Sequence, residues 1–132
     1  MALSYTTTLR NNRLDEIPTA IGSNGLLRIY NGTPPANVGT ALSGNDMLVE
    51  LALAATSAPA ASGAELTFNA ITDGEVVETG TATFFRLLTS GAAAVVQGTV
   101  GTSATDIVFD SVSFVLGGNV EVTSAVITAG NP

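Results

Sequence analysis

Residues 80–88 read GTATFFRLL, and this stretch decides the fold class. A β-strand points successive side chains to opposite faces, so Phe85 and Leu87 share one face while Phe84 and Arg86 share the other. Neither face is cleanly polar, which predicts a strand that is covered on both sides. We therefore expect this part of the chain to lie inside a packed β structure.

Short β-type runs continue on both sides of this stretch, separated by clusters of Gly, Pro, Asn and Asp. This spacing is typical of an all-β sandwich or barrel. We predict an all-β fold, a two-sheet antiparallel sandwich of jelly-roll type with a short N-terminal helix or arm. The expected strands cover residues 26–30, 47–54, 65–71, 80–88, 95–100, 107–109, 112–116 and 120–127, of which the last two form a hairpin around Gly117-Gly118-Asn119.

A helical pattern occurs near the N-terminus, where Leu9, Arg13 and Ile17 recur at four-residue spacing. Ser4 or a following threonine is expected to cap the start of this helix. A proline inside a helix removes one hydrogen bond and clashes with the carbonyl four residues back. Pro18 therefore predicts that the helix ends or kinks near Ile17.

The chain is expected to divide into an N-terminal arm or helix, residues 1–22, and a β-sandwich domain, residues 23–132. Residues 31–46 contain two prolines and three glycines and predict a long loop. Residues 56–63 are small and of low complexity. They indicate either a plain extended loop or a close contact with another subunit.

The composition restricts the classes of function. Eleven carboxylates against four arginines give a net charge of −7 and an isoelectric point near 4.1, so the field repels phosphate backbones and anionic lipid headgroups. We expect no nucleic-acid partner and no membrane partner. The chain contains no cysteine and no histidine, which removes disulfides, thiolate metal sites and the usual nucleophile–base pairs. The sequence predicts no enzyme, no catalytic residues, no cofactor and no metal site.

One cluster of carboxylates is a candidate site. Asp73, Glu75 and Glu78 lie close together in the sequence, as an acid and base pair or a calcium site would require. The chain lacks the twelve-residue alternation of Asp and Asn around a glycine that calcium loops show, so we interpret the cluster as a solvated turn. Asp106 and Asp110 are likewise interpreted as turn residues.

The arginines offer a different kind of site. Arg10 and Arg13 lie three residues apart in the N-terminal segment. Arginine forms bidentate and stacked contacts and is enriched in interface cores. The pair therefore indicates an arm that docks on an acidic or carbonyl-rich partner, and the alternative is pairing within the chain to Asp15 or Glu16.

Four segments carry a resemblance to a known family. They read YTTTLRNNRLD at residues 5–15, LRIYNGTPP at 27–35, GTATFFRL at 80–87 and VTSAVIT at 122–128. On these segments the chain resembles a family of small proteins encoded by tailed bacteriophages and prophages. The resemblance implies a virion structural protein similar to the capsid cement or decoration proteins. Those proteins have jelly-roll or related β folds and sit as dimers or trimers on the outside of an icosahedral shell, where they clamp neighbouring capsomers.

The resemblance also implies partners and a location. The partners would be the major capsid protein and further copies of this chain. The location would be the outer capsid surface of the virion, after synthesis in the cytoplasm of the bacterial host. Under this hypothesis the partner contacts are Tyr5, Leu9, Arg10 and Arg13 in the arm, with second contacts at Tyr30 and the loop 31–46.

Two other functions stay open as alternatives to a capsid cement protein. A phage tail or baseplate component would share this composition. A carbohydrate-binding module would need exposed Tyr5 or Tyr30 beside paired polar groups, because sugars stack on exposed aromatic rings.

Overall fold

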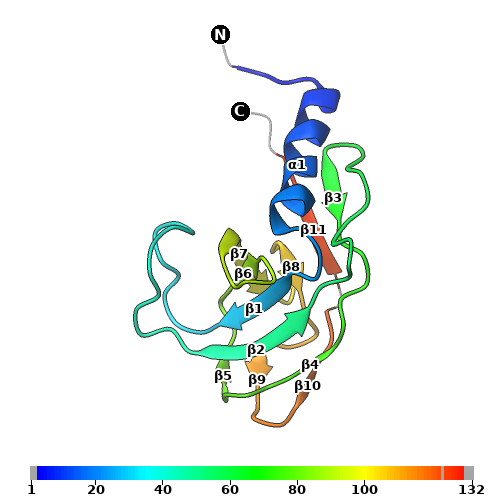
Figure 1. Ribbon diagram of the computed structural model, residues 1–132. Coiled ribbons are helices and arrows are strands. Elements are labelled where there is room, and N and C mark those ends of the chain that lie inside the picture. Colours follow the sequence, from blue (N-terminus) through cyan, green and yellow to red (C-terminus); the bar gives the residue numbers. More distant parts are fainter. Residues whose placement is uncertain (1–2, 123, 130–132) are drawn as a thin grey trace.

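The computed structural model describes residues 3–122 and 124–129 (Figure 1). Within these residues the chain is mostly β, with one helix, a large mixed sheet and two small sheets. The helix α1 covers Thr7–Ile21. The strands are β1 Leu26–Tyr30, β2 Met47–Ala52, β3 Glu65–Thr67, β4 Gly74–Glu75, β5 Gly80–Thr81, β6 Phe84–Leu88, β7 Ala94–Gly101, β8 Ile107–Val108, β9 Ser113–Phe114, β10 Asn119–Val120 and β11 Ser124–Thr128.

The large sheet has the strand order β2-β1-β6-β7-β8-β11-β3, and the small sheets are β10-β4 and β5-β9. Strands β7 and β8 pair in parallel, so the expectation of a purely antiparallel sheet is wrong at this pair. Beside this pair Asp106 Oδ2 accepts from the backbone N–H of Thr99 at 3.1 Å, which fastens the turn between the two strands to β7. The finer arrangement as a sandwich or jelly roll stays a prediction.

The hairpin expected from residues 112–116 and 120–127 is wrong. Strand β9 pairs with β5, β10 pairs with β4, and β11 pairs with β8 and β3. The glycine turn explains this, because Gly117 donates to the carbonyl of Val76 and Val76 donates to the carbonyl of Gly118. These bonds tie the turn to the residue after β4, and the backbone N–H of Gly118 also donates to the carbonyl of Val115 within the turn at 2.8 Å. Residue 123, inside the predicted strand 120–127, lies outside the described residues.

The helix is capped as expected and ends later than expected. The hydroxyl of Thr6 accepts from the backbone N–H of Leu9 at 3.2 Å, which confirms a threonine cap. The helix continues through Pro18 to Ile21, so the predicted end near Ile17 is wrong. Two groups favour the extra turn: the carbonyl of Pro18 accepts from Gly22 at 3.0 Å, and the side chain of Ile21 is buried in the core.

The core lies against the inner face of the large sheet. Leu27 lies opposite Leu87 and Ile29 lies opposite Phe85 in the antiparallel pair of β1 and β6, and all four side chains are buried in one cluster. Burial of such side chains is the main stabilising contribution to the fold. All five side chains of β6 are buried, which confirms that both faces of this strand are covered.

Candidate interaction surface

Three of the predicted contact residues lie at the start of α1: Leu9 and Arg13 are on its first half, and Tyr5 lies just before it. The guanidinium carbon of Arg13 lies 5.1 Å from the centre of the Tyr5 ring, within the range of a cation–π contact. Leu9 and Arg13 are four residues apart, so they share one helix face. The side chain of Leu9 is 43% exposed. We call Tyr5, Leu9 and Arg13 the helix-end surface.

Arg10 points to a partner inside the chain. Its Nε and Nη2 atoms donate to the carbonyl oxygen of Ala129 at 2.9 and 2.7 Å. The predicted carbonyl partner of an arginine is therefore found within the same chain. Arg10 holds α1 against the residue that follows β11.

Asp15, one of the two acids predicted as an alternative partner for these arginines, has another role. Asp15 Oδ1 accepts from the backbone N–H of Ala61 at 2.7 Å, and Asn11 Oδ1 accepts from that of Ala64 at 2.8 Å. These bonds fasten the low-complexity segment 56–63 and the residue after it to α1. In this segment Ala58 is buried in one cluster with the helix residue Leu14, whereas Pro59 and Ala60 are exposed.

Tyr30 is part of the packing of the sheet. Its side chain is 4% exposed, and its ring stacks on Phe84 with 5.2 Å between centroids and 18° between planes. Little of the ring is open to a partner. The exposed aromatic platform that a carbohydrate-binding module needs is therefore not provided by Tyr30.

The loop 31–46 is held over the outer face of the sheet by two polar side chains that pair across β6 and β7. Arg86 donates from Nε to Gln97 Oε1 at 3.0 Å and from Nη2 to the carbonyl of Thr40 at 2.7 Å. Gln97 Nε2 in turn donates to the carbonyl of Pro35 at 2.9 Å. Arg86 is buried, and on the outside of the loop Leu42 is 37% exposed.

A second arginine lies directly opposite Arg86 in the register of β1 and β6. This residue, Arg28, forms a salt bridge with Glu50 on β2, with 2.7 Å between Nε and Oε2. The hydrogen bond to Glu50 raises the pKa of Arg28 above its ordinary value. The two arginines therefore have separate partners, Glu50 for Arg28 and Gln97 and Thr40 for Arg86.

The carboxylates weighed as a site do not gather around one point. Asp73 Oδ2 accepts from Asn119 Nδ2 at 3.2 Å, and Asp106 Oδ2 accepts from Thr99. Glu75 and Glu78 are exposed. Among the described residues, His, Cys, Asp and Glu side chains form no group of three or more that is placed to hold a metal ion.

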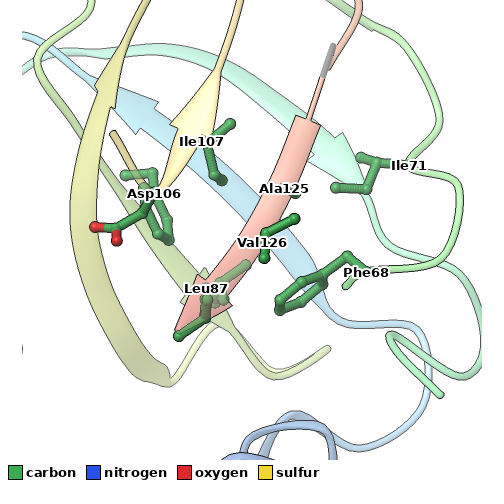
Figure 2. Close-up of a pocket in the computed structure, with 9 residues that line it drawn as sticks. Phe68, Ile71, Leu87, Asp106, Ile107, Ala125 and Val126 are labelled. Carbon is green, nitrogen blue, oxygen red and sulfur yellow. The ribbon is translucent and has the colours of Figure 1, made fainter. Parts of the chain in front are cut away.

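A small cavity lies under β11 (Figure 2). Figure 2 shows Phe68, Leu87, Ile107 and Val126 around it, while the carboxylate of Asp106 turns away from the other side chains. Its volume is about 10 Å³, roughly that of one water molecule, whereas ligand pockets span about 300–1,000 Å³. The cavity is a packing void of the apolar interior.

The end of the molecule opposite the N-terminus of α1 carries a surface that the sequence did not indicate (Figure 1). Val77, Val115 and Leu116 are each more than half exposed there. We call these three residues the turn-end surface. Beside it lies an open hollow of about 380 Å³, which we call the acidic hollow, whose lining includes Asp110, Ser111, Phe114, Val115, Asn119 and Glu121. The sequence pattern placed Val115 and Leu116 in a strand, so nothing marked them as exposed.

No protein-family model, no curated protein and no solved structure matches this chain. Among the described residues, α1 is too short and too polar to cross a lipid bilayer, and there is no other helix that does.

Proposed function

We propose that this chain is a capsid cement, or decoration, protein of a tailed bacteriophage or prophage. It binds the major capsid protein on the outside of the assembled shell and stabilises contacts between subunits. It works without catalysis and without a cofactor. The proposal includes the finer architecture that the resemblance implies, a sandwich of jelly-roll type that contains one parallel strand pair.

The observation that carries this proposal is the placement of exposed apolar side chains at two opposite ends of one small β domain. Leu9 lies on α1, and Val115 and Leu116 lie in the turn between β9 and β10, which Figure 1 shows at the opposite end of the molecule from the N-terminus of α1. A protein that bridges subunits needs contact surfaces on more than one side. Many modest contacts of this kind stabilise a shell through multivalency, because the protein binds the assembled lattice better than separate subunits.

The sandwich is supported by the way the large sheet surrounds its core. Leu87 on β6 and Ile107 on β8 line the same small cavity as Val126 on β11 (Figure 2). These strands are not all neighbours in the sheet, since β7 and β8 separate β6 from β11. The sheet therefore curves so that distant strands contribute to one core.

A binding experiment tests the proposal. The purified chain is added to assembled shells that lack it and, separately, to unassembled capsid subunits, and the bound fraction is measured by sedimentation. We expect saturable binding to shells and much weaker binding to subunits. Leu9→Asp and Leu42→Asp, at the helix end and on the loop 31–46, are expected to lower shell occupancy. Ser103→Asp, in an exposed loop, is the matched control and is expected to bind like the parent chain. Equal binding to subunits and shells, or binding to tails alone, would contradict the proposal.

A further inference from the structure

The turn-end surface is rigid as well as apolar. Gly117 and Gly118 bond to Val76 at 2.9 and 2.8 Å, and the backbone N–H of Leu116 donates to Thr79 Oγ1 at 2.9 Å. The φ angle of Gly117 is +85°, a conformation that suits glycine. The turn is therefore fixed in a shape that keeps Leu116 outside the core. Exposed apolar side chains gathered at one rigid place mark an interaction surface.

The charges at the two ends differ in sign. At the helix end, Arg10 bonds to a neutral carbonyl and Arg13 lies over an aromatic ring, so these contacts leave both positive charges in place. The first turn of α1 contains no acidic residue, and the N-terminus of a helix adds a partial positive charge. Residues 7–13 of α1 therefore carry two arginines and no carboxylate, within a chain whose net charge is −7, and Asp15 and Glu16 follow further along the helix.

The opposite end is acidic. Asp110 and Glu121 line the hollow beside the turn-end surface, and Glu75 and Glu78 are exposed on and after β4. Two copies that met through this end alone would bring like charges together, and two that met through the helix end alone would do the same. Like-charge contacts suppress such pairings, whereas opposite ends complement one another.

We propose that the helix-end surface of one copy docks on the turn-end surface and acidic hollow of a second copy. Leu9 packs against Val115 and Leu116, and Arg13 faces the carboxylates of Asp110 and Glu121. The two surfaces are different, so the contact is heterologous, and repetition of it yields a ring or an open chain of copies. This contact between two copies does not require a shell. A second step rests on the proposed function: on the shell, the neighbour that the helix end reaches is another copy of this chain.

Cysteine cross-linking tests the contact, because the chain contains no cysteine of its own. Leu9→Cys and Leu116→Cys are made separately, mixed at about 0.5 mM because a contact of this size is expected to be weak, and oxidised. We expect the disulfide between positions 9 and 116 to exceed the 9–9 and 116–116 disulfides at least severalfold. A chain carrying both substitutions is expected to form a ladder of multimers. Leu42→Cys mixed with Leu9→Cys is the control for random collision.

Charge reversal tests the orientation. Arg13→Glu in the Leu9→Cys chain, or Glu121→Arg in the Leu116→Cys chain, is expected to lower the 9–116 yield several-fold. Combining both reversals is expected to restore it, as a double-mutant cycle requires of facing charges. Failure of the combination to restore the yield would overturn the pairing of Arg13 with Glu121.

A yield of the 9–116 disulfide no higher than the yields of the 9–9, 116–116 and 9–42 products would overturn the proposal as a whole. The two proposals fail separately. Shell binding without a 9–116 cross-link overturns the contact between copies and leaves the proposed function standing. A 9–116 cross-link without shell binding supports the contact and contradicts the function.

Discussion

Arg10 donates two hydrogen bonds to the carbonyl oxygen of Ala129, from Nε at 2.9 Å and from Nη2 at 2.7 Å, although the two residues are 119 positions apart in the sequence. These bonds join α1 to the residue that follows β11. Residues 1–22 were expected to form an arm or helix separate from residues 23–132. Since Ile21 is also buried in the core, we expect deletion of the helix to damage the fold, so point substitutions are the better test of its surface.

The first prediction concerns this pair. Arg10→Met removes a charged donor from a half-buried carbonyl and is expected to lower the free energy of unfolding by about 1–2 kcal/mol. Arg13→Met, on the same helix, removes an exposed cation–π contact and is expected to cost less than about 1 kcal/mol. Urea denaturation of both variants measures the difference. A loss for Arg13→Met as large as that for Arg10→Met would contradict the role given to Arg10.

The second prediction concerns the close approach of α1 to the sheet at Gly25. A Cβ atom there would clash with Ile21 Cγ2 and would lie 2.8 Å from the carbonyl oxygen of Leu88. Gly25→Ala is therefore expected to lower the free energy of unfolding by about 1–3 kcal/mol. Gly91→Ala is the control, because its Cβ would meet nothing closer than Thr89 Oγ1 at 3.8 Å. Similar unfolding midpoints for the two variants would refute this account of Gly25.

The third prediction compares the two arginines that face each other across β1 and β6. Arg86→Met leaves the carbonyl of Thr40 without its donor and is expected to cost about 2 kcal/mol. It should also speed amide hydrogen exchange in the loop 31–46, measured by mass spectrometry. Arg28→Met removes a partly exposed ion pair and is expected to cost less than about 1 kcal/mol, with no change in the exchange of that loop. Unchanged amide exchange of the loop 31–46 in Arg86→Met would contradict the role of Arg86 in holding this loop.

The raised pKa of Arg28 also has a consequence for pH dependence. A folded pKa above the unfolded value means that the folded state holds the proton more tightly. The contribution of Arg28 is then fully present below the unfolded pKa of arginine and is lost only as the pH rises through the higher folded value. The difference in stability between the parent chain and Arg28→Met should therefore not fall between neutral and mildly alkaline pH.

The fourth prediction concerns Pro18. A proline in a helix interior costs about 3 kcal/mol relative to alanine, and it returns roughly 0.4–1 kcal/mol by restricting the unfolded chain. Since α1 continues to Ile21, Pro18→Ala is expected to raise the free energy of unfolding by about 2 kcal/mol. The neighbouring substitution Thr19→Ala should change it by less than about 0.7 kcal/mol. A loss of stability in Pro18→Ala would show that the ring itself contributes to packing.

Local patterns in the sequence predicted the parts of the fold that depend on local physics. The alternation of Leu27 and Ile29 placed β1 at residues 26–30, where the structure has it. The apolar faces of residues 80–88 predicted a strand covered on both sides. The choice of strand partners depends on contacts far away in the sequence. Bonds from Val76 to the glycine turn, and from Thr99 to Asp106, redirected the chain where no local pattern marked it.

The candidate surface was predictable to a similar degree. Helical spacing placed Leu9 and Arg13 on one face, and the structure adds Tyr5 to them. The same spacing could not show that Arg10 bonds to Ala129, because that contact joins the two ends of the chain. Nor could it show that Leu116 is exposed, because a valine and leucine run is typical of a buried strand.

The central claim is that this chain coats the outside of a capsid, and a count of its copies in purified virions tests it most directly. Heads and tails are separated, the chain is quantified in each by mass spectrometry, and its position is mapped by cryo-electron microscopy. The account predicts many copies at lattice-symmetric positions on the outer surface of the head. A few copies confined to the tail, or none in the virion, would contradict it.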